Sequence, residues 1–467
     1  MTTALTAGKA TLPTPTYTAM HPWELYSPNL AIEYRQSFDE GLDVEKYADL
    51  FRAVEALPTE DIDTKEKLAD TLFELVMNAP AREGYAYNEP SDLDGIRALR
   101  KPYPVAGDVP VEGVLLDKIH GAWLGRICGC MLGKTVEGIR TNELIPFLKE
   151  SGNYPLHRYI VSTDCSEKTY EKYRFPFRRV CYVDKTNGMP PDDDTNYVLL
   201  AQTLIERHGR DFTPVNMAQH WIRMQGKDAY CTAERVAFCN FVKGYQPPHS
   251  ATYKNAYREW IGAQIRGDYF GYINPGDPET AADMAWRDAS ISHIKNGIYG
   301  EMWVAAMLAV AAVAEGDDPT TRIETVIRGG LGEIPATSRL CEAIISVLDG
   351  YHNGVTQADC FAAIHTRWNE HDGHDWCHTI SNAMIVAASL LYGGGDFGKS
   401  ICMAVETGFD TDCNGATVGS VLGMLFGRSC IGDEWAEPMK DTLYATLFGL
   451  DKVSIEERAR LTLKHIK

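Results

Sequence analysis

The chain of 467 residues is 45 % apolar and 23 % charged, a composition typical of ordinary folded proteins. Its formal net charge of −19, without a dense basic run, argues against nucleic acid as a partner. No run reaches the ~20 apolar residues of a membrane span, and the start lacks the basic-then-apolar pattern of a secretory signal. We therefore expect a cytoplasmic protein with no membrane partner.

The N-terminal part predicts a helical extension that precedes the main domain. Residues 1–20 are polar and rich in Pro and Thr, so we expect a loosely ordered tail. Residues 21–110 contain a helical pattern with apolar residues at Leu68, Leu72, Leu75 and Val76, which Pro80 stops. The end of this extension is rich in Pro and Gly, which is typical of a connector. We expect the catalytic domain to occupy residues 111–467.

Helical patterns dominate after the connector, and alternating β-branched residues are scarce. Apolar residues recur at helical spacing in six segments, several of which close on glycine, as a C-cap would: 115–133, 194–209, 296–316, 375–395, 396–408 and 454–467. The last segment opens with Ser454 and Glu457 in capping-box spacing. We find no self-similarity at the periods of solenoid repeats. The sequence therefore predicts an all-α fold.

Two of these segments carry a glycine at every fourth position. The first ladder is Gly121, Gly125, Gly129 and Gly133, and the second is Gly415, Gly419, Gly423 and Gly427. Residues four apart share one face of a helix, and each glycine costs about 1 kcal/mol relative to alanine. Charged residues such as Arg126 and Lys134 exclude a membrane dimer motif. We predict two central helices whose backbones pack closely.

Two acidic clusters, far apart in the sequence, stand at the start of predicted helices. Asp192, Asp193 and Asp194 form one, and Asp410 and Asp412 form the other. Adjacent carboxylates repel one another unless they are solvated or share a cation. A solvated loop and helix capping are the structural alternatives. Taken together, five carboxylates at two helix starts favour a site for Mg²⁺ or Mn²⁺, which a pair of ions could share.

Other metal-binding motifs match poorly. A calcium loop starting at Asp410 would need a bidentate Glu where Val421 stands. Asp192, Asp193 and Asn196 loosely resemble the first motif of magnesium-dependent terpene synthases, but the second cluster lacks the Asn/Ser/Glu motif of those enzymes. A phosphatase DxD loop should follow a buried strand, whereas the preceding segment has a helical pattern. Turnover of a prenyl diphosphate would reveal the terpene-synthase alternative.

Three segments stand out together: "DKIHGAWLGRICGCMLGKTVEG" (117–138), "PDDDTNYVL" (191–199) and "GFDTDCNGATVGSVLGMLFG" (408–427). They resemble, in this order, the opening helix, the first metal motif and the second metal motif of the ADP-ribosylglycohydrolase family, which also includes lens crystallins. The resemblance spans roughly residues 114–450. It implies a compact orthogonal bundle of helices with two Mg²⁺ or Mn²⁺ ions. It also implies hydrolysis of an N- or O-glycosidic bond at the anomeric carbon of an ADP-ribosyl or related ribosyl or glycosyl group.

The resemblance also implies site residues. The metal-binding carboxylates would be Asp192, Asp193, Asp194, Asp410 and Asp412. Glu137 matches a glutamate that lies near substrate and metals, and we expect it, or alternatively Asp194, to activate water or carry the proton. On the substrate side, His293 stands where members often show Thr-His, and Asn296 follows it. A satisfied core histidine is the structural alternative for His293.

Three departures from the family pattern bear on the site. Asp192 stands where the family usually has threonine, Cys413 replaces another threonine, and Cys130 replaces an aspartate. A thiol is a poor ligand for Mg²⁺, so either Cys413 does not coordinate or the site favours Mn²⁺. The substrate is expected to be a small molecule or an ADP-ribosylated protein. The alternative is a non-catalytic, crystallin-like member that acts as a binding or structural protein.

Overall fold

The computed structural model describes residues 15–105 and 107–466, in two compact units, 1–83 and 84–467. Most of the expected N-terminal tail, residues 1–14, lies outside the described residues. The two units divide upstream of the expected boundary at residues 110/111, and the functional meaning of that boundary stays a prediction.

The first unit is a small helical body. Its α-helices are α1 (Leu30–Asp39), α2 (Ala48–Glu55) and α3 (Ile62–Met77). Leu72 and Val76 of α3 are buried with Phe51 of α2 in one apolar core, whereas Leu68 is exposed. The expected helix is therefore present and ends before Pro80, but its buried stripe includes Leu72 and Val76 and not Leu68.

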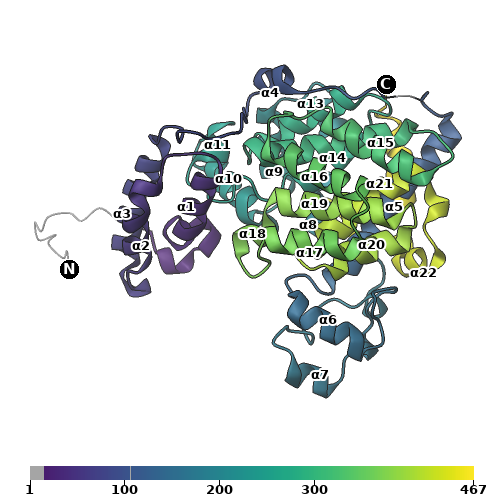
Figure 1. Cartoon of the computed structure of the whole chain (residues 1–467), viewed down its shortest axis with the longest axis horizontal. Helices are drawn as coiled ribbons and strands as arrows, with labels where there is room; N and C mark the ends of the chain where they lie inside the picture. Colours follow the sequence, from purple (N-terminus) through teal and green to yellow (C-terminus); the bar gives the residue numbers. More distant parts are fainter. Residues whose placement is uncertain (1–14, 106, 467) are drawn as a thin grey trace, which may run out of the picture. The chain divides into compact units, whose positions relative to one another are not determined.

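The second unit is helical apart from one antiparallel hairpin, so the all-α prediction is confirmed. Figure 1 shows its elements. They are α4 (Leu93–Leu99), α5 (Glu112–Lys134), α6 (Thr141–Glu150), α7 (Glu167–Lys172), α8 (Asp193–His208), α9 (Pro214–Met224), α10 (Thr232–Val242), α11 (His249–Thr252), α12 (Asp268–Tyr272), α13 (Pro278–Ala289), α14 (Lys295–Val313), α15 (Pro319–Leu331), α16 (Arg339–His352), α17 (Gln357–Arg367), α18 (Gly373–Cys377), α19 (Thr379–Gly393), α20 (Phe397–Glu406), α21 (Thr411–Phe426), β1 (Leu443–Leu447), β2 (Leu450–Val453), α22 (Asp433–Ala436) and α23 (Ile455–Leu463).

One expected helix is divided in two. The segment 375–395 forms the end of α18 and then α19, with a break at His378. The backbone of His378 is extended, and its Nδ1 accepts a hydrogen bond from the Ile380 amide as the N-cap of α19. The apolar pattern continues across the break and does not explain it. The capping hydrogen bond of His378, which starts a new helix, does.

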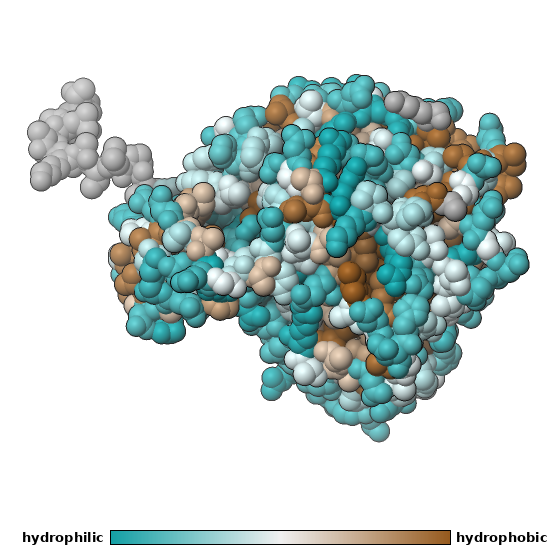
Figure 2. Space-filling model, turned by 45° about the horizontal axis from the view of Figure 1, so that its top comes forward, coloured by the Kyte–Doolittle hydropathy of each residue, from teal (hydrophilic) through white to brown (hydrophobic). Residues whose placement is uncertain are grey.

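Helix α14 is the centre of the core of the second unit. Contrary to the sequence expectation, its length and composition would allow it to cross a membrane, but its most apolar window is 100 % buried inside the protein. It packs against α12, α13, α15 and α21. Figure 2 shows a mainly hydrophilic face, with apolar residues in a narrow recess over the second unit and in smaller scattered patches. An apolar helix in this position is a core helix.

The two glycine ladders form one antiparallel seam between α5 and α21, which lie side by side (Figure 1). A Cβ on Gly125 or Gly129 would lie under 3.0 Å from the carbonyl oxygen of Gly419 or Gly415, respectively. Real Cβ atoms do not approach backbone so closely, so only glycine allows this contact. Gly427 differs from the others, since it is the C-cap of α21 with φ 84°.

Ion pairs and a hydrogen bond join residues 84–105 to the rest of the second unit. The buried carboxylate of Glu89 lies 2.9 Å from the Arg339 guanidinium, and Arg100 pairs with Glu333 at 2.5 Å. The Trp286 indole donates to the Ser91 carbonyl at 2.9 Å. This segment is therefore part of the structure of the second unit.

Replacement of Gly129 by alanine should destabilise the protein by about 1–3 kcal/mol or more, because the new methyl group would overlap the backbone of α21. Gly113 provides a control in the same helix, since a Cβ there meets nothing within 4 Å. G113A should leave stability unchanged or raise it by up to about 1 kcal/mol. Thermal unfolding of both variants tests the seam, and equal melting temperatures would contradict it.

His220 of α9 should make stability dependent on pH. Its Nε2 lies 2.9 Å from Thr203 Oγ1 of α8, and burial lowers its pKa to about 4. The unfolded chain takes up this proton below about pH 6.5 and the folded chain does not, so stability falls between pH 6.5 and 4, by up to about 3 kcal/mol. H220Q should show less loss over this range in urea unfolding. Parallel pH profiles for the two proteins would refute this assignment.

Candidate metal centre

The first acidic cluster forms the N-terminus of α8. Asp192 is the N-cap and accepts a hydrogen bond from the Asp194 amide at 2.9 Å. Apolar residues of α8 are buried after this turn, which holds the helix start against the core. Asp192 and Asp194 are buried, whereas Asp193 is partly exposed. Capping therefore occurs, as the structural alternative expected: Asp192 caps the helix, and Asp193 Oδ1 also accepts from the Asp194 amide at 3.2 Å.

The second cluster forms the N-terminus of α21, after a strained turn. Gly408 and Phe409 have φ of 74° and 58°, and the second value is unusual for a residue with a side chain. Asn382 accepts a hydrogen bond from the Asp410 amide at 3.2 Å. Thr411 Oγ1 donates to the Gly133 carbonyl at 2.9 Å, which ties the start of α21 to the end of α5. The seam thus fixes where these carboxylates lie.

A stripe on α5 faces both clusters. Arg126, Cys130 and Lys134 are four residues apart, next to the glycine ladder, so they share one face of the helix. Lys134 Nζ lies 2.5 Å from Asp192 Oδ2, and Arg126 Nη2 lies 2.9 Å from Asp194 Oδ1. The Cys130 thiol donates to Asp194 Oδ2 at 3.9 Å. The four-residue spacing of Arg126, Cys130 and Lys134 is visible in the sequence and could have predicted this stripe.

The side chains gather into two possible ligand groups that share Asp412. The oxygens of Asp192, Asp194 and Asp412 and the Cys130 sulfur all lie within 4.8 Å of one another. The same limit holds for Asp410, Asp412 and the Cys413 sulfur. The structure therefore brings together four of the five expected carboxylates in these groups, adds two thiols, and leaves Asp193 beside them.

Concentrated negative charge and burial shift the pKa values of these acids. Burial and neighbouring carboxylates raise the pKa of Asp193 and Asp412 well above the usual range. Burial does the same for Asp194, although Arg126 opposes it. Burial alone would also raise the pKa of Asp192, but Lys134 outweighs it and holds that pKa below the ordinary value. The cluster therefore takes up protons where no cation balances its charge.

Glu137 stands beside the second cluster, just after the end of α5. Its side chain is exposed, yet burial of its surroundings and the charges of Asp192 and Asp410 raise its pKa to about 7. A carboxyl group with this pKa can exchange a proton near neutral pH. Its position and exposure suit contact with a bound molecule.

The donor set fits divalent cations. Asp412 Oδ1 is buried and has no hydrogen-bond partner among the described residues, which is costly unless a cation lies against it. Carboxylate oxygens are the usual ligands of Mg²⁺ and Mn²⁺. Asp193, Asp410 and Asp412 also have no basic partner in an ion pair within the described part of the chain.

His293 and Asn296 lie in other buried surroundings. The Asn296 amide donates to Glu89 and Glu259, both at 2.8 Å, and its oxygen accepts the Leu340 amide at 3.0 Å. His293 contacts Ser292 Oγ at 2.8 Å and lines a cavity of about 470 Å³. Within the described residues, no hydrogen bond or ion pair joins either residue to the carboxylate groups. Their substrate-binding role stays a prediction.

Further residues, which the sequence did not reveal, surround the centre. The Cys377 thiol donates to Asp410 Oδ2 at 3.7 Å. The Arg140 guanidinium lies over the Trp376 ring, 4.8 Å from its centroid, and the charges of Glu370 and Asp410 act on it. These residues come from segments far from both motifs, so their positions depend on the fold and no motif indicates them.

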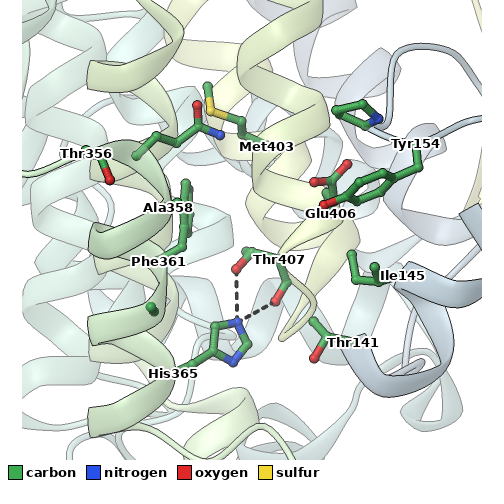
Figure 3. A pocket seen from close by; sticks show the side chains of 13 residues that line it. Thr141, Ile145, Tyr154, Thr356, Ala358, Phe361, His365, Met403, Glu406 and Thr407 are labelled. Atoms are coloured by element: carbon green, nitrogen blue, oxygen red, sulfur yellow. Dashed lines mark hydrogen bonds between the residues drawn. The ribbon is translucent and has the colours of Figure 1, made fainter. Parts of the chain in front are cut away.

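A cavity of about 630 Å³ opens beside the loop that carries Asp410, between α6, α17 and α20 (Figure 3). His365 Nε2 contacts the Thr407 carbonyl at 3.0 Å and its hydroxyl at 3.1 Å. The His365 ring also packs on Phe409, with centroids 5.0 Å apart. The carboxylates of the two ligand groups do not line this cavity, but its wall continues into their loop.

Most of the chain matches one known protein family. The family model described as ADP-ribosylglycohydrolase matches residues 112–463, most of the chain. The chain belongs to the ADP-ribosylglycohydrolase family. The resemblance is thus confirmed, and with it the expected helical fold and, in general terms, a glycohydrolase activity.

Among solved structures, the chain is similar to one titled "ADP-ribosylglycohydrolase-related protein complex", with 17 % identity and a TM-score of 0.49. That match covers 76 % of this chain and 98 % of the other. No curated protein matches the chain.

Removal of Arg126 should destabilise the protein by about 3–5 kcal/mol, because it pairs with two buried carboxylates, Asp194 at 2.9 Å and Asp268 at 3.0 Å. R126M tests this in urea unfolding. R178M is the control, since the side chain of Arg178 is 58 % exposed and pairs with Glu167 at the surface, where such pairs contribute about 0–1 kcal/mol. Equal losses in the two variants would count against a structural role for the Arg126 pair.

Proposed function

We propose that the protein is a metal-dependent glycohydrolase that cleaves an N- or O-glycosidic bond at the anomeric carbon of an ADP-ribosyl or related ribosyl or glycosyl substrate. The observation that carries the proposal is the meeting of both acidic motifs in two ligand groups that share Asp412, with Glu137 beside them. Two divalent ions, Mg²⁺ or Mn²⁺, would hold vicinal hydroxyl groups of the sugar and lower the pKa of a water molecule.

The carboxylates have separate roles in this proposal. Asp192, Asp193, Asp194, Asp410 and Asp412 hold the ions. Glu137 is the better candidate for moving the proton, because its side chain is exposed beside the two ligand groups, where it can reach a bound molecule. Asp194 is the poorer candidate, since one of its oxygens is paired with Arg126 and the side chain is fully buried.

The surrounding charge also suits the reaction. Cleavage at an anomeric carbon passes through a transition state that resembles an oxocarbenium ion, with positive charge on the sugar ring. Carboxylates held in fixed positions stabilise such a charge. Glu137 would give its proton to, or take it from, the water or leaving group that meets the ring.

An ADP-ribosyl group would also bring a pyrophosphate. Arg140 is the first basic residue after Glu137 in the sequence, and its guanidinium lies over the ring of Trp376. A guanidinium next to an aromatic ring can bind a phosphate and an adenine base. Arg140 and Trp376 are therefore our candidates for binding the nucleotide part of the substrate. His293 and Asn296 remain predicted substrate-binding residues in addition to these two.

The alternative is a non-catalytic family member. Its case rests on Cys130 and Cys413, which replace oxygen ligands of the family pattern. Several buried carboxylates at one place are costly to a fold, however, and a purely structural protein has no need of them. We therefore favour the enzyme.

The test combines metal binding with turnover. Wild type should show a rise in melting temperature with Mg²⁺ or Mn²⁺ and should hydrolyse ADP-ribosylated or simple riboside substrates. D412N should lose the rise, because Asp412 belongs to both ligand groups. E137Q should keep the rise and lose at least about 100-fold in kcat, because the proton carrier is absent.

Glu150 gives a control, since its side chain is about half exposed and pairs with Lys172 away from the centre. E150Q should match wild type in both assays. If wild type shows no rise with either ion and no turnover, the non-catalytic alternative holds. If E137Q keeps full activity, Glu137 is not the proton carrier.

A further inference from the structure

We propose that the metal centre is a mixed thiolate and carboxylate site that prefers Zn²⁺, Co²⁺ or Fe²⁺ to Mg²⁺, with Cys130 and Cys413 as ligands. The inference rests on the proposed function in one respect, namely that the centre binds divalent cations. It concerns the chemical class of the ion, which the carboxylates alone do not decide.

Cys130 meets the geometric requirement of a ligand. Its sulfur belongs to the group in which every pair of donor atoms lies within 4.8 Å, together with Asp192, Asp194 and Asp412. Ligand bonds of about 2.0–2.3 Å around one ion place donor atoms within such a distance of each other. One sulfur and three oxygens can therefore surround a single four-coordinate ion.

Cys413 provides a sulfur to the second group. Its thiol lies within the same limit of Asp410 and Asp412. Each group thus contains one thiol, and Asp412 belongs to both. Cys130 is fully buried and Cys413 is 6 % exposed, so neither sulfur has bulk water as a competing partner. The arrangement gives one sulfur donor to each of two ions.

Thiol ligands select among divalent cations. Mg²⁺ requires nearly octahedral oxygen ligands, and sulfur adds little to its binding. Zn²⁺, Co²⁺ and Fe²⁺ accept thiolate and lower coordination numbers. Each thiol would release its proton to solvent as the sulfur–metal bond forms, so that binding leaves a thiolate and takes up no electron.

The competing explanation is that the thiols only donate hydrogen bonds to carboxylates. Cys130 makes such a contact with Asp194 at 3.9 Å. Cys377 makes a similar contact with Asp410 at 3.7 Å but belongs to neither ligand group. Cys377 is therefore a matched control, since its thiol has the same kind of carboxylate contact and no expected bond to the ion.

The experiment is a titration of the full-length protein with Co²⁺, followed by absorption spectroscopy. Wild type should develop a sulfur-to-cobalt charge-transfer band in the near ultraviolet together with visible d–d bands. C130S and C413T should each lose about half of the charge-transfer band, and C130S/C413T should lose it entirely. C377S should keep the full band. In competition, wild type should bind Zn²⁺ at least tenfold more tightly than Mg²⁺, and the double variant should narrow that ratio.

The outcomes separate the two proposals. If Co²⁺ gives d–d bands and raises the melting temperature of wild type without a charge-transfer band, the ligands are oxygens and this inference is overturned, while the metal-dependent function stands. If neither Co²⁺, Mg²⁺ nor Mn²⁺ binds, the proposed function fails and this inference with it. The wild-type spectrum decides the point even where a cysteine variant does not fold.

Discussion

The contact of backbone on backbone between α5 and α21 determines where the centre lies. Gly121, Gly125 and Gly129 face Gly423, Gly419 and Gly415 in antiparallel order, and Gly133 reaches the backbone of Thr411 and Asp412. Because the two backbones touch without side chains between them, α5 and α21 have little freedom to slide along each other. The last contact places the end of α5 next to the start of α21. The second acidic motif therefore lies next to the end of α5, which carries Cys130, Lys134 and, just beyond the helix, Glu137.

This close packing also explains how the protein tolerates so much buried negative charge. The face of α5 beside the seam presents Arg126 and Lys134 to Asp194 and Asp192 at fixed distances. These pairs compensate the first cluster, whereas Asp412 keeps one oxygen without a partner among the described residues. The basic side chains thus hold the walls of the site in place and leave its centre acidic. A divalent cation would meet there the unpartnered oxygen of Asp412, which belongs to both ligand groups.

Local patterns in the sequence predicted α3, α5, α8, α14, α20, α21 and α23, together with the seam and the acidic clusters. Glycine spacing indicated close packing, and the motifs indicated Asp192, Asp194, Asp410 and Asp412 because a helix start puts neighbouring residues in one place. Long-range pairing was not predictable in this way. His378 breaks an apolar helical pattern through a capping hydrogen bond, and Asn296 is held by Glu89, which comes from far upstream. The spacing of residues in the sequence indicates neither the cap at His378 nor the contact of Asn296 with Glu89, since both depend on how the chain folds.

The position of Glu89 indicates that the folded core extends upstream of the segment that matches the family. The family match begins at residue 112, yet Glu89 is buried against Arg339, and the same guanidinium also pairs with Glu259 at 2.7 Å. Asn296 lies between these two carboxylates at the start of α14, the central helix of the core. Without residues 84–110, the Asn296 amide and the Arg339 amide would each lose an acceptor in a buried place. The helix core that supports the candidate metal centre therefore depends on a segment outside the family match.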